Sequence, residues 1–326
     1  MDSILVTGGS GFTGGALCRR LVADGESVVT FVRASSRTED LRALGVECRV
    51  VDIGDAADVR ANFHGIRAVY HIAGAFRGEH ADLDEFRRIN VEATRNLLEA
   101  ARDAGVERFV HCSTVGVQGH IEDPPADENY RFKPHDHYQR SKLEGELVAR
   151  KYMAAGLPGA VIRPSAIYGP GDLRFLKLMR TIARGQFVMI GAGRNLYHMT
   201  YIDDLVNGFL LAGRRPEALG EVFSIAGGKY LPTRELVNLI ADLLERPRPR
   251  LTVPSAPLRV AAVACSAVCR PLKIEPPLYP RRLDFFTKGR AFSTAKARRL
   301  LGYEPAVSLE DGLRRTIGWY RTQGLM

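Results

Sequence analysis

The sequence has few cysteines, and their spacing fits neither a disulfide framework nor a zinc site. The five cysteines are odd in number and form no CxxC pair; they are Cys18, Cys48, Cys112, Cys265 and Cys269. We therefore predict no metal centre and a reducing compartment, the cytoplasm. The chain opens directly on a predicted strand, so we expect no secretory signal peptide.

The sequence also lacks an apolar run long enough to cross a bilayer. Residues 258–269 are apolar almost all round, but this stretch is too short for a membrane span and is flanked by arginines and prolines. We expect a buried helix there, or one that caps the substrate. Peripheral membrane contact by the same stretch is the less favoured alternative.

Basic and aromatic residues are not interleaved as they are in nucleic-acid-binding proteins. The formal net charge is +9, with local basic density at residues 246–250 and at Arg281 and Arg282. We interpret this charge as a solvated surface together with an anionic cofactor or substrate, and we predict no nucleic-acid partner.

A glycine loop stands between a predicted strand and a predicted helix at the start of the chain. Residues 4–7 are a short apolar run, Gly8, Gly11 and Gly14 follow, and residues 16–22 have helical character. Such a loop lets the backbone approach a pyrophosphate, whose charge is stabilised by the N–H groups and dipole of the helix N-terminus. This order of strand, loop and helix predicts a dinucleotide site.

Apolar strands alternate with helical patterns up to about residue 165. The expected strands are residues 4–7, 27–33, 48–52, 68–73, 108–113 and 159–163, and the expected helices between them include residues 57–63, 86–104 and 138–155. This alternation predicts an α/β fold with a doubly wound parallel sheet of the Rossmann type.

The pattern changes in the remainder of the chain, where glycines and prolines separate short elements. We expect a dinucleotide-binding domain over residues 1–165, with residues 200–228 returning to it through a strand at 222–225. The expected smaller, interleaved C-terminal substrate-binding part comprises residues 166–199 and 229–326, with a linker or lid at 246–257 and a last amphipathic helix at 306–321.

Residues able to contact a ligand follow the predicted strands. The glycine loop follows the first strand, and the next five strands are followed by Arg33, Asp52, Ala73, Ser113 with Thr114, and Pro164. Because the carboxyl ends of parallel strands meet at one edge of a sheet, these residues are expected at the edge where ligands bind.

Tyr138 and Lys142 open the helix expected after the fifth strand. At spacing i and i+4 both side chains project on one helix face. A lysine ammonium beside a phenol favours the phenolate and so lowers the phenol pKa, which is ~10 when unperturbed. Tyr138 is therefore a candidate general acid/base near neutral pH.

Together these motifs resemble the extended short-chain dehydrogenase/reductase family, of the NAD-dependent epimerase/dehydratase type. Residues 7–14 match TGxxGxxG, Tyr138 and Lys142 match YxxxK, residues 112–119 are similar to the hydroxyl motif, and residues 163–170 resemble RPxxxYGP. Within the family, the sequence from residue 285 to 305 looks most like the 3β-hydroxysteroid dehydrogenase and dihydroflavonol-reductase-like branch.

The resemblance implies catalytic roles for Thr114, Tyr138 and Lys142. Tyr138 would move the proton, Thr114 would hydrogen-bond the substrate oxygen, and Lys142 would hold the ribose hydroxyls. The family also suggests a homodimer formed through residues 86–104 and 138–155. The cofactor-binding residues expected are Gly8, Gly11, Phe12, Thr13, Gly14, Arg33, Arg37, Asp52, Ile53, Ala73, Ser113, Tyr138, Lys142 and Pro164.

The residues after Thr114 bear on the type of reaction. Sugar-nucleotide 4,6-dehydratases of the family carry Asp-Glu there, whereas this chain has Val115 and Gly116, which cannot act as acid or base. We therefore predict an NAD(P)-dependent oxidoreductase that interconverts a secondary alcohol and a ketone on a hydrophobic small molecule, of sterol, isoprenoid or flavonoid type. The alternatives are a sugar-nucleotide (UDP-sugar) 4-epimerase and a non-catalytic redox sensor, although a sensor would not need Tyr138.

The end of the second strand bears on the choice of cofactor. NAD binding favours an acidic residue there for the ribose 2′-hydroxyl, but this chain has Arg33 and then Arg37. A guanidinium can pair with a 2′-phosphate, so we favour NADP over NAD. Asp52 is expected to contact adenine, to cap the following helix, or both.

Four further residue sets have less specific interpretations. We expect His71 to be a hydrogen-bonded core histidine, and His135 and His137 to be loop residues near the pocket mouth and not zinc ligands. Cys265 and Cys269 are interpreted as core packing. Arg290, with Arg281 and Arg282, would bind the diphosphate of a sugar nucleotide, or Arg290 would face solvent.

Overall fold

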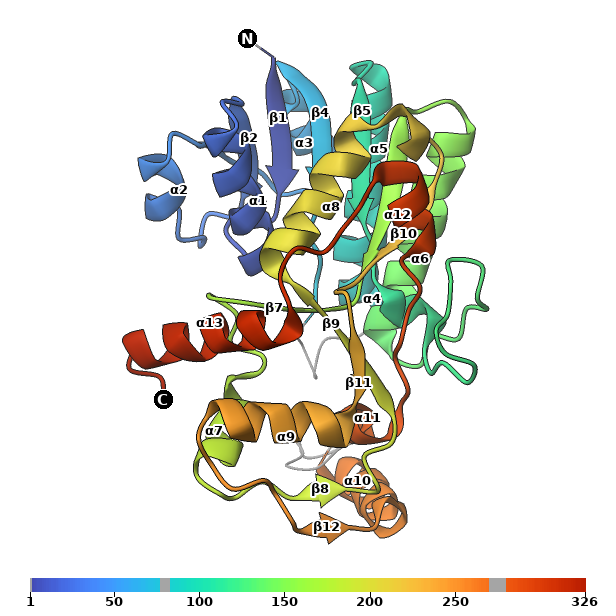
Figure 1. Ribbon diagram of the computed structural model, residues 1–326. Coiled ribbons are helices and arrows are strands. Elements are labelled where there is room, and N and C mark those ends of the chain that lie inside the picture. The colour runs from blue at the N-terminus through green and yellow to red at the C-terminus, as the bar shows by residue number, and fades with distance from the viewer. Residues whose placement is uncertain (1, 77–82, 270–279) are drawn as a thin grey trace.

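A seven-stranded parallel sheet forms one half of the molecule (Figure 1). The computed structural model describes residues 2–76, 83–269 and 280–326, apart from the side chains of Ser266 and residues 280–282. The strand order is β10-β6-β5-β4-β1-β2-β3, which confirms the doubly wound α/β prediction and the return of residues 222–225 to the sheet. The strands are β1 (Ser3–Thr7), β2 (Val28–Val32), β3 (Glu47–Val50), β4 (Ile66–His71), β5 (Arg108–Cys112), β6 (Gly159–Pro164) and β10 (Val222–Ile225).

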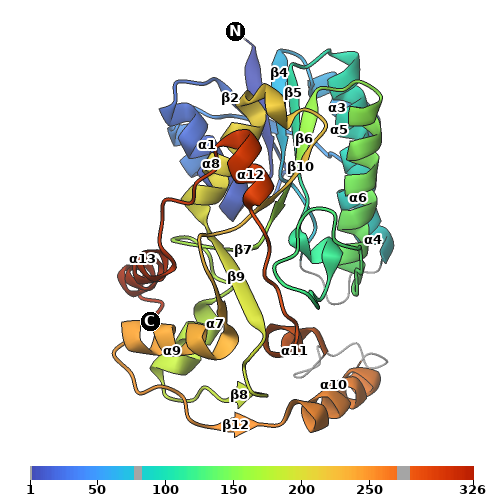
Figure 2. The same ribbon diagram turned by 45° about the vertical axis from the view of Figure 1, so that its right-hand side comes forward.

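Helices cover both faces of this sheet, so its strands are buried on two sides (Figures 1 and 2). Successive residues of β1 show this, because Leu5 and Val6 belong to two different core clusters. The covering helices include α1 (Phe12–Ala23) and α8 (Ile202–Arg214) on one face, and α3 (Ala56–Asn62), α5 (Ala93–Asp103) and α6 (His137–Ala154) on the other. Two short helices, α2 (Glu39–Ala43) and α12 (Ala295–Leu301), lie at the periphery of the same half.

The helix predicted over residues 86–104 is present, but it contains a π-helical turn. The structure has α4 (Leu83–Arg87), a π-helical turn η1 (Arg88–Glu92) and then α5. The wider turn contains buried Asn90, whose carbonyl oxygen lies so close to α6 that a Cβ on Gly145 would overlap it. The π-helical turn therefore lies where the two helices approach most closely beside the sheet edge.

Helix α1 begins earlier than the sequence pattern indicates. We expected the helix from residue 16, but it begins at Phe12, so that Gly14 and Gly15 lie in its first turn. Glycine is required at position 14 by a close backbone approach, because a Cβ on Gly14 would overlap the carbonyl oxygen of Gly8.

The second half of the molecule lies beyond the carboxyl edge of the parallel sheet and is built from short elements. One small sheet has the order β11-β9-β7, and β12 pairs with β8 in another. Within residues 246–257, expected to be a linker or lid, residues 252–253 pair with β8 and residues 246–251 have no regular secondary structure. The elements are β7 (Ala166–Tyr168), α7 (Leu176–Ala183), β8 (Met189–Ile190), β9 (Leu196–Tyr201), β11 (Tyr230–Pro232), α9 (Thr233–Leu243), β12 (Thr252–Val253), α11 (Pro280–Thr287) and α13 (Leu309–Thr322).

Helix α10 (Ser255–Cys269) is not the buried helix that its composition predicts. Val260 and Val263 are 71% and 59% exposed, and Cys265 and Cys269 are half-buried. Within the described residues, no helix is long and apolar enough to cross a membrane.

Candidate active site

The glycine loop forms a tight cradle at the carboxyl end of β1. Gly8 has φ of +74°, and the Gly11 N–H donates to the Gly8 carbonyl at 2.9 Å. Gly11 is the N-cap of α1 and has no side chain that could accept the helix N–H groups. The N–H groups of the first turn, which includes Phe12 and Thr13, therefore face the cradle. The loop geometry fits the pyrophosphate of a dinucleotide.

Thr7 fixes this loop against the end of β4. Its hydroxyl accepts hydrogen bonds from the N–H groups of Ile72 and Ala73, each at 3.1 Å, and lies 2.8 Å from His71 Nδ1. The other ring nitrogen of His71 lies 2.9 Å from the Thr94 hydroxyl. Burial lowers the pKa of His71 to about 3, so this histidine is neutral and hydrogen-bonded in the core, as predicted.

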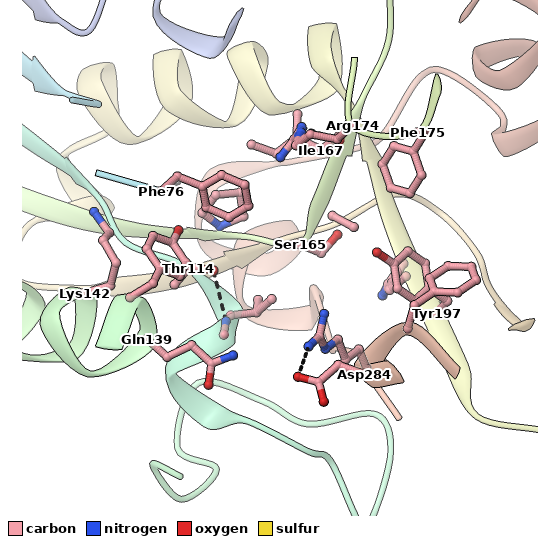
Figure 3. A pocket seen from close by; sticks show the side chains of 18 of the residues that line it. Phe76, Thr114, Gln139, Lys142, Ser165, Ile167, Arg174, Phe175, Tyr197 and Asp284 are labelled. Carbon is pink, nitrogen blue, oxygen red and sulfur yellow. Dashed lines mark hydrogen bonds and ion pairs between the residues drawn. The ribbon is translucent and has the colours of Figure 1, made fainter. Parts of the chain in front are cut away.

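Tyr138 and Lys142 lie in the first turns of α6 and line one pocket together with Thr114. Figure 3 shows Lys142 and Thr114 on the same side of this pocket. Asp136 caps the helix by accepting the Gln139 N–H at 2.7 Å. The Lys142 ammonium donates to the Cys112 carbonyl at 2.5 Å, which holds it at the end of β5. Burial is the largest influence on Lys142 and lowers its pKa.

Thr114 and Phe76 complete this side of the pocket. The Thr114 hydroxyl oxygen accepts the Gly116 N–H at 3.0 Å, which leaves its O–H as a donor. Phe76 meets the Tyr138 ring edge-to-face, with centroids 5.0 Å apart. The motifs did not reveal Phe76, which follows β4 and lies far from Tyr138 in sequence.

A buried ion pair lies one turn further along the helix face that carries Tyr138 and Lys142. Glu146 and Arg163 are both fully buried; two guanidinium nitrogens of Arg163 donate to the carboxylate at 3.0 and 2.5 Å. The Ser113 hydroxyl donates to the same carboxylate at 2.6 Å. The hydroxyl of Ser113, a residue expected to bind the cofactor, is therefore hydrogen-bonded to another residue of the protein. Sequence reasoning missed Glu146, although its position four residues after Lys142 places it on the same helix face.

The residues expected around the adenine end are found on the neighbouring strands. Arg33 and Arg37 are exposed after β2. The Asp52 carboxylate pairs with Arg88 at 3.0 Å, a partner that sequence reasoning missed. The alternative role of Asp52 as a helix cap is wrong, because Asp55 is the N-cap of α3 and accepts the N–H groups of residues 57 and 58.

Ile53, Ala73 and Pro164 were also expected near the cofactor. Ile53 is half-buried beside the Asp52 turn, and its carbonyl accepts from the Asn96 amide at 3.0 Å. Ala73 lies against the loop, since a Cβ on Gly8 would stand 3.0 Å from its nitrogen. Pro164 lines the pocket.

Facing the Tyr138 side, the pocket is walled by aromatic and aliphatic side chains (Figure 3). Its volume is about 820 Å³. Segments far apart in sequence supply this wall: Ile167, Phe175, Leu178, Phe187, Ile190, Tyr197, Leu283, Phe285, Phe286 and Phe292. The space thus joins a polar catalytic side to an apolar far side.

A few charged side chains interrupt the apolar wall. Arg290 lines the pocket and lies 3.7 Å from Asp284, which also pairs with Lys288 at 3.0 Å. Arg174 and Lys177 line it as well. The side chains of Arg281 and Arg282, proposed from the sequence as diphosphate ligands, lie outside the described part of the chain.

The loop histidines do not form a metal site in the described structure. His135 is exposed and adjoins Gly119, which lines the pocket, whereas His137 is exposed at the start of α6. Among the described residues, no group of three His, Cys, Asp or Glu side chains is arranged to hold a metal ion.

Comparisons with known proteins agree over most of the chain. A model described as the NAD dependent epimerase/dehydratase family matches residues 4–226. A 2-alkyl-3-oxoalkanoate reductase of Stenotrophomonas maltophilia (strain K279a) is 35% identical and aligns over 96% of this chain and 97% of its own. A 3-beta-hydroxysteroid dehydrogenase of Mycolicibacterium neoaurum is 30% identical and aligns over 98% of this chain and 92% of its own. The crystal structure of gox2253 is similar with a TM-score of 0.84 and 28% identity, over 100% of both chains.

Proposed function

Because the chain belongs to the NAD-dependent epimerase/dehydratase family of enzymes and is an NAD(P)-dependent oxidoreductase, we propose that it interconverts a secondary alcohol and a ketone on a hydrophobic small molecule. The observation that carries this proposal is the aromatic and aliphatic wall opposite Tyr138 and Thr114. The names of the two relatives, which denote an oxoalkanoate reductase and a hydroxysteroid dehydrogenase, support a substrate of this kind.

In the proposed reaction, Tyr138 transfers the proton at the substrate oxygen, and the Thr114 O–H donates a hydrogen bond to the same oxygen. Lys142, held by the Cys112 carbonyl, places a positive charge on the helix face of Tyr138 and favours its phenolate. The glycine loop would hold the pyrophosphate of the nucleotide, and the nicotinamide would supply the hydride chemistry when bound. The apolar wall excludes water from the reacting carbon.

A pair of tyrosine variants on one helix tests this proposal. Tyr138→Phe removes the transferable proton and should lower kcat by roughly 10²–10⁴-fold while leaving the nucleotide Kd unchanged. Tyr152→Phe is the matched control, since Tyr152 lies on α6 and bonds to Glu99, away from the pocket. Steady-state rates and nucleotide titration measure both effects; a Tyr138→Phe enzyme as active as Tyr152→Phe would disprove the role.

We further propose that NADP is preferred over NAD. Arg33 and Arg37 are exposed beside the end of β2, the strand end where a ribose 2′-phosphate would lie. Arg33→Asp should weaken the binding of NADP by about tenfold or more, equivalent to ~1.4 kcal/mol of binding free energy, and leave NAD binding nearly unchanged. Separate titrations with the two nucleotides provide the test, and an equal loss for both would contradict the preference.

A second candidate is sugar-nucleotide epimerisation, favoured by the cations Arg174, Lys177 and Arg290 in the pocket lining. These side chains could bind a diphosphate. Epimerisation regenerates the nicotinamide in each turnover, so it predicts tightly retained NAD and no net consumption of cofactor. Net oxidation or reduction of one nicotinamide per product excludes this candidate.

We also propose a homodimer through α4, α5 and α6. Leu147 supports this proposal, because it is 47% exposed on the outer face of α6. Leu147→Glu should shift the sedimentation coefficient from dimer to monomer without unfolding the chain. A monomeric wild-type protein at micromolar concentration would overturn the proposal.

A further inference from the structure

Helix α10 presents a continuous apolar face to solvent, at the end of the molecule remote from the parallel sheet (Figure 2). At helical spacing, the exposed residues fall on one face and buried Ala262 with half-buried Cys265 falls on the other. The exposed side chains of this face are Val260, Val263, Ala264, Ala267 and Val268, and exposed Ala261 lies at its edge. Val260 and Val268 are 71% and 65% exposed, so the face is covered by nothing in the described structure.

The chain around this helix is strongly basic. Residues 246–269 hold four arginines and no acidic residue. Arg250 and Arg259 are exposed, and in the described part of the chain neither has an ion-pair partner. This charge would attract an anionic surface.

The same surface adjoins the apolar end of the pocket. Helix α10 packs against α11, whose Leu283 and Phe286 line the pocket wall. At the start of α10, Ser255 lies against Gly191, which follows the pocket residue Ile190. Helix α10 therefore lies between the wall of the substrate cavity and a molecule held on its exposed face.

We propose that this surface docks on an anionic lipid bilayer. We call it the α10 surface and define it as Val260, Val263, Ala264, Ala267 and Val268 together with Arg250 and Arg259. A stable protein interface takes about 20–30 residues on each side, whereas this face offers only five apolar side chains. Apolar side chains flanked by arginines suit the headgroup boundary, where each cation near an anionic surface contributes about 1 kcal/mol. The inference goes beyond the proposed function and does not depend on turnover.

Vesicle binding by the full-length protein tests this inference. The probes are vesicles of phosphatidylcholine alone and of phosphatidylcholine mixed with phosphatidylglycerol. We expect co-sedimentation with the mixed vesicles only, decreasing as salt is raised. Val260→Asp/Val263→Asp should reduce the bound fraction at least about tenfold, since it adds charge to the apolar face. Arg250→Gln/Arg259→Gln should reduce binding less and weaken its dependence on salt.

Leu219→Asp is the matched control, because Leu219 is 46% exposed in a loop outside the α10 surface. It should bind vesicles like the wild type. Circular dichroism checks that all variants are folded. The proposal is overturned if the wild type ignores the mixed vesicles or if the double aspartate variant binds equally well. It is also overturned if that variant instead abolishes a vesicle-independent dimer, because the face would then bind a second copy.

Discussion

The two sides of the pocket are built in different ways. On the nucleotide side, one helix brings Tyr138, Lys142 and Glu146 to a single face, and strands β1, β4 and β5 end beside them. On the far side, the wall is assembled from residues between 167 and 197 and from α11 with the segment that follows it. The catalytic side thus rests on short, local spacings, whereas the substrate side rests on distant segments that meet only in the folded chain.

The two sides of the pocket also differ in the contacts that hold their side chains in place. Thr7 is hydrogen-bonded to His71, and the Ser113 hydroxyl donates to Glu146; all four side chains are buried. Such a network fixes the positions of groups that must meet a cofactor of constant shape. The far wall uses aromatic contacts instead, such as Phe187 against Phe286 with centroids 6.0 Å apart. Apolar contacts of this kind can be exchanged with little change to the fold, so the substrate can differ among related chains.

The largest expected effect is a loss of folding stability on the nucleotide side. Glu146→Ala leaves the buried Arg163 guanidinium without its carboxylate and should destabilise the fold by about 3–5 kcal/mol. Glu144→Ala, on the same helix, removes the exposed partner of Arg87 and should cost less than about 1 kcal/mol. Chemical denaturation measures both. Similar losses for the two variants would mean that the buried pair does not stabilise this side.

A smaller effect should follow from crowding the glycine loop. Gly14→Ala places a methyl group against the Gly8 carbonyl and should cost ~1–3 kcal/mol of stability, with at least a tenfold loss of nucleotide affinity. Gly318→Ala in α13 has open space around the new methyl group and should be neutral or stabilising. Nucleotide titration by calorimetry separates the two. Unchanged affinity in Gly14→Ala would contradict the cradle.

Truncating the far wall should affect the substrate but not the nucleotide. Phe286→Ala removes an aromatic ring from the pocket lining, so kcat/KM for an apolar ketone should fall about 10–100-fold, the equivalent of ~1–3 kcal/mol. The nucleotide Kd should stay the same, which is the internal control. A variant that loses nucleotide binding to the same degree would show that the two sides are not separable.

The smallest expected effect is a dependence of stability on pH that involves both sides. Burial lowers the pKa of His71 to about 3 and that of His198, on the far side, to about 4. The unfolded chain, with histidine pKa values of ~6.5, therefore binds more protons below that pH, and stability is lost as pH falls toward the folded pKa values. Each histidine should contribute roughly 1 kcal/mol of loss for the first pH unit below ~6.5.

Denaturation at a series of pH values measures this dependence. His64→Gln is the control, since His64 is exposed and should leave the slope unchanged. One cooperative transition would show that the two sides unfold together, and two transitions with different slopes would show that they do not. A stability that stays flat from neutral pH to about pH 5 would contradict the buried neutral histidines.

The sequence was sufficient for the parallel sheet, the glycine loop and the Tyr138–Lys142 pair because each depends on short-range periodicity or spacing. It could not predict the π-helical turn at Asn90, which arises from the close approach of α6 at Gly145. The Asp52–Arg88 pair joins residues that only the fold brings together. Composition was misleading for α10, because an apolar sequence indicates that a surface needs covering but not that the chain itself covers it.

The most direct test of the central claim follows the hydride itself. The enzyme is incubated with an apolar ketone and a reduced nicotinamide nucleotide that carries deuterium at C4 on the face from which the enzyme transfers hydride, that face being fixed by assaying both labelled forms. We expect one deuterium at the new carbinol carbon for each nucleotide oxidised, and loss of this transfer in Tyr138→Phe but not in Tyr152→Phe. Conversion of a sugar nucleotide without net nucleotide oxidation, together with no deuterium transfer to apolar ketones, would contradict this claim.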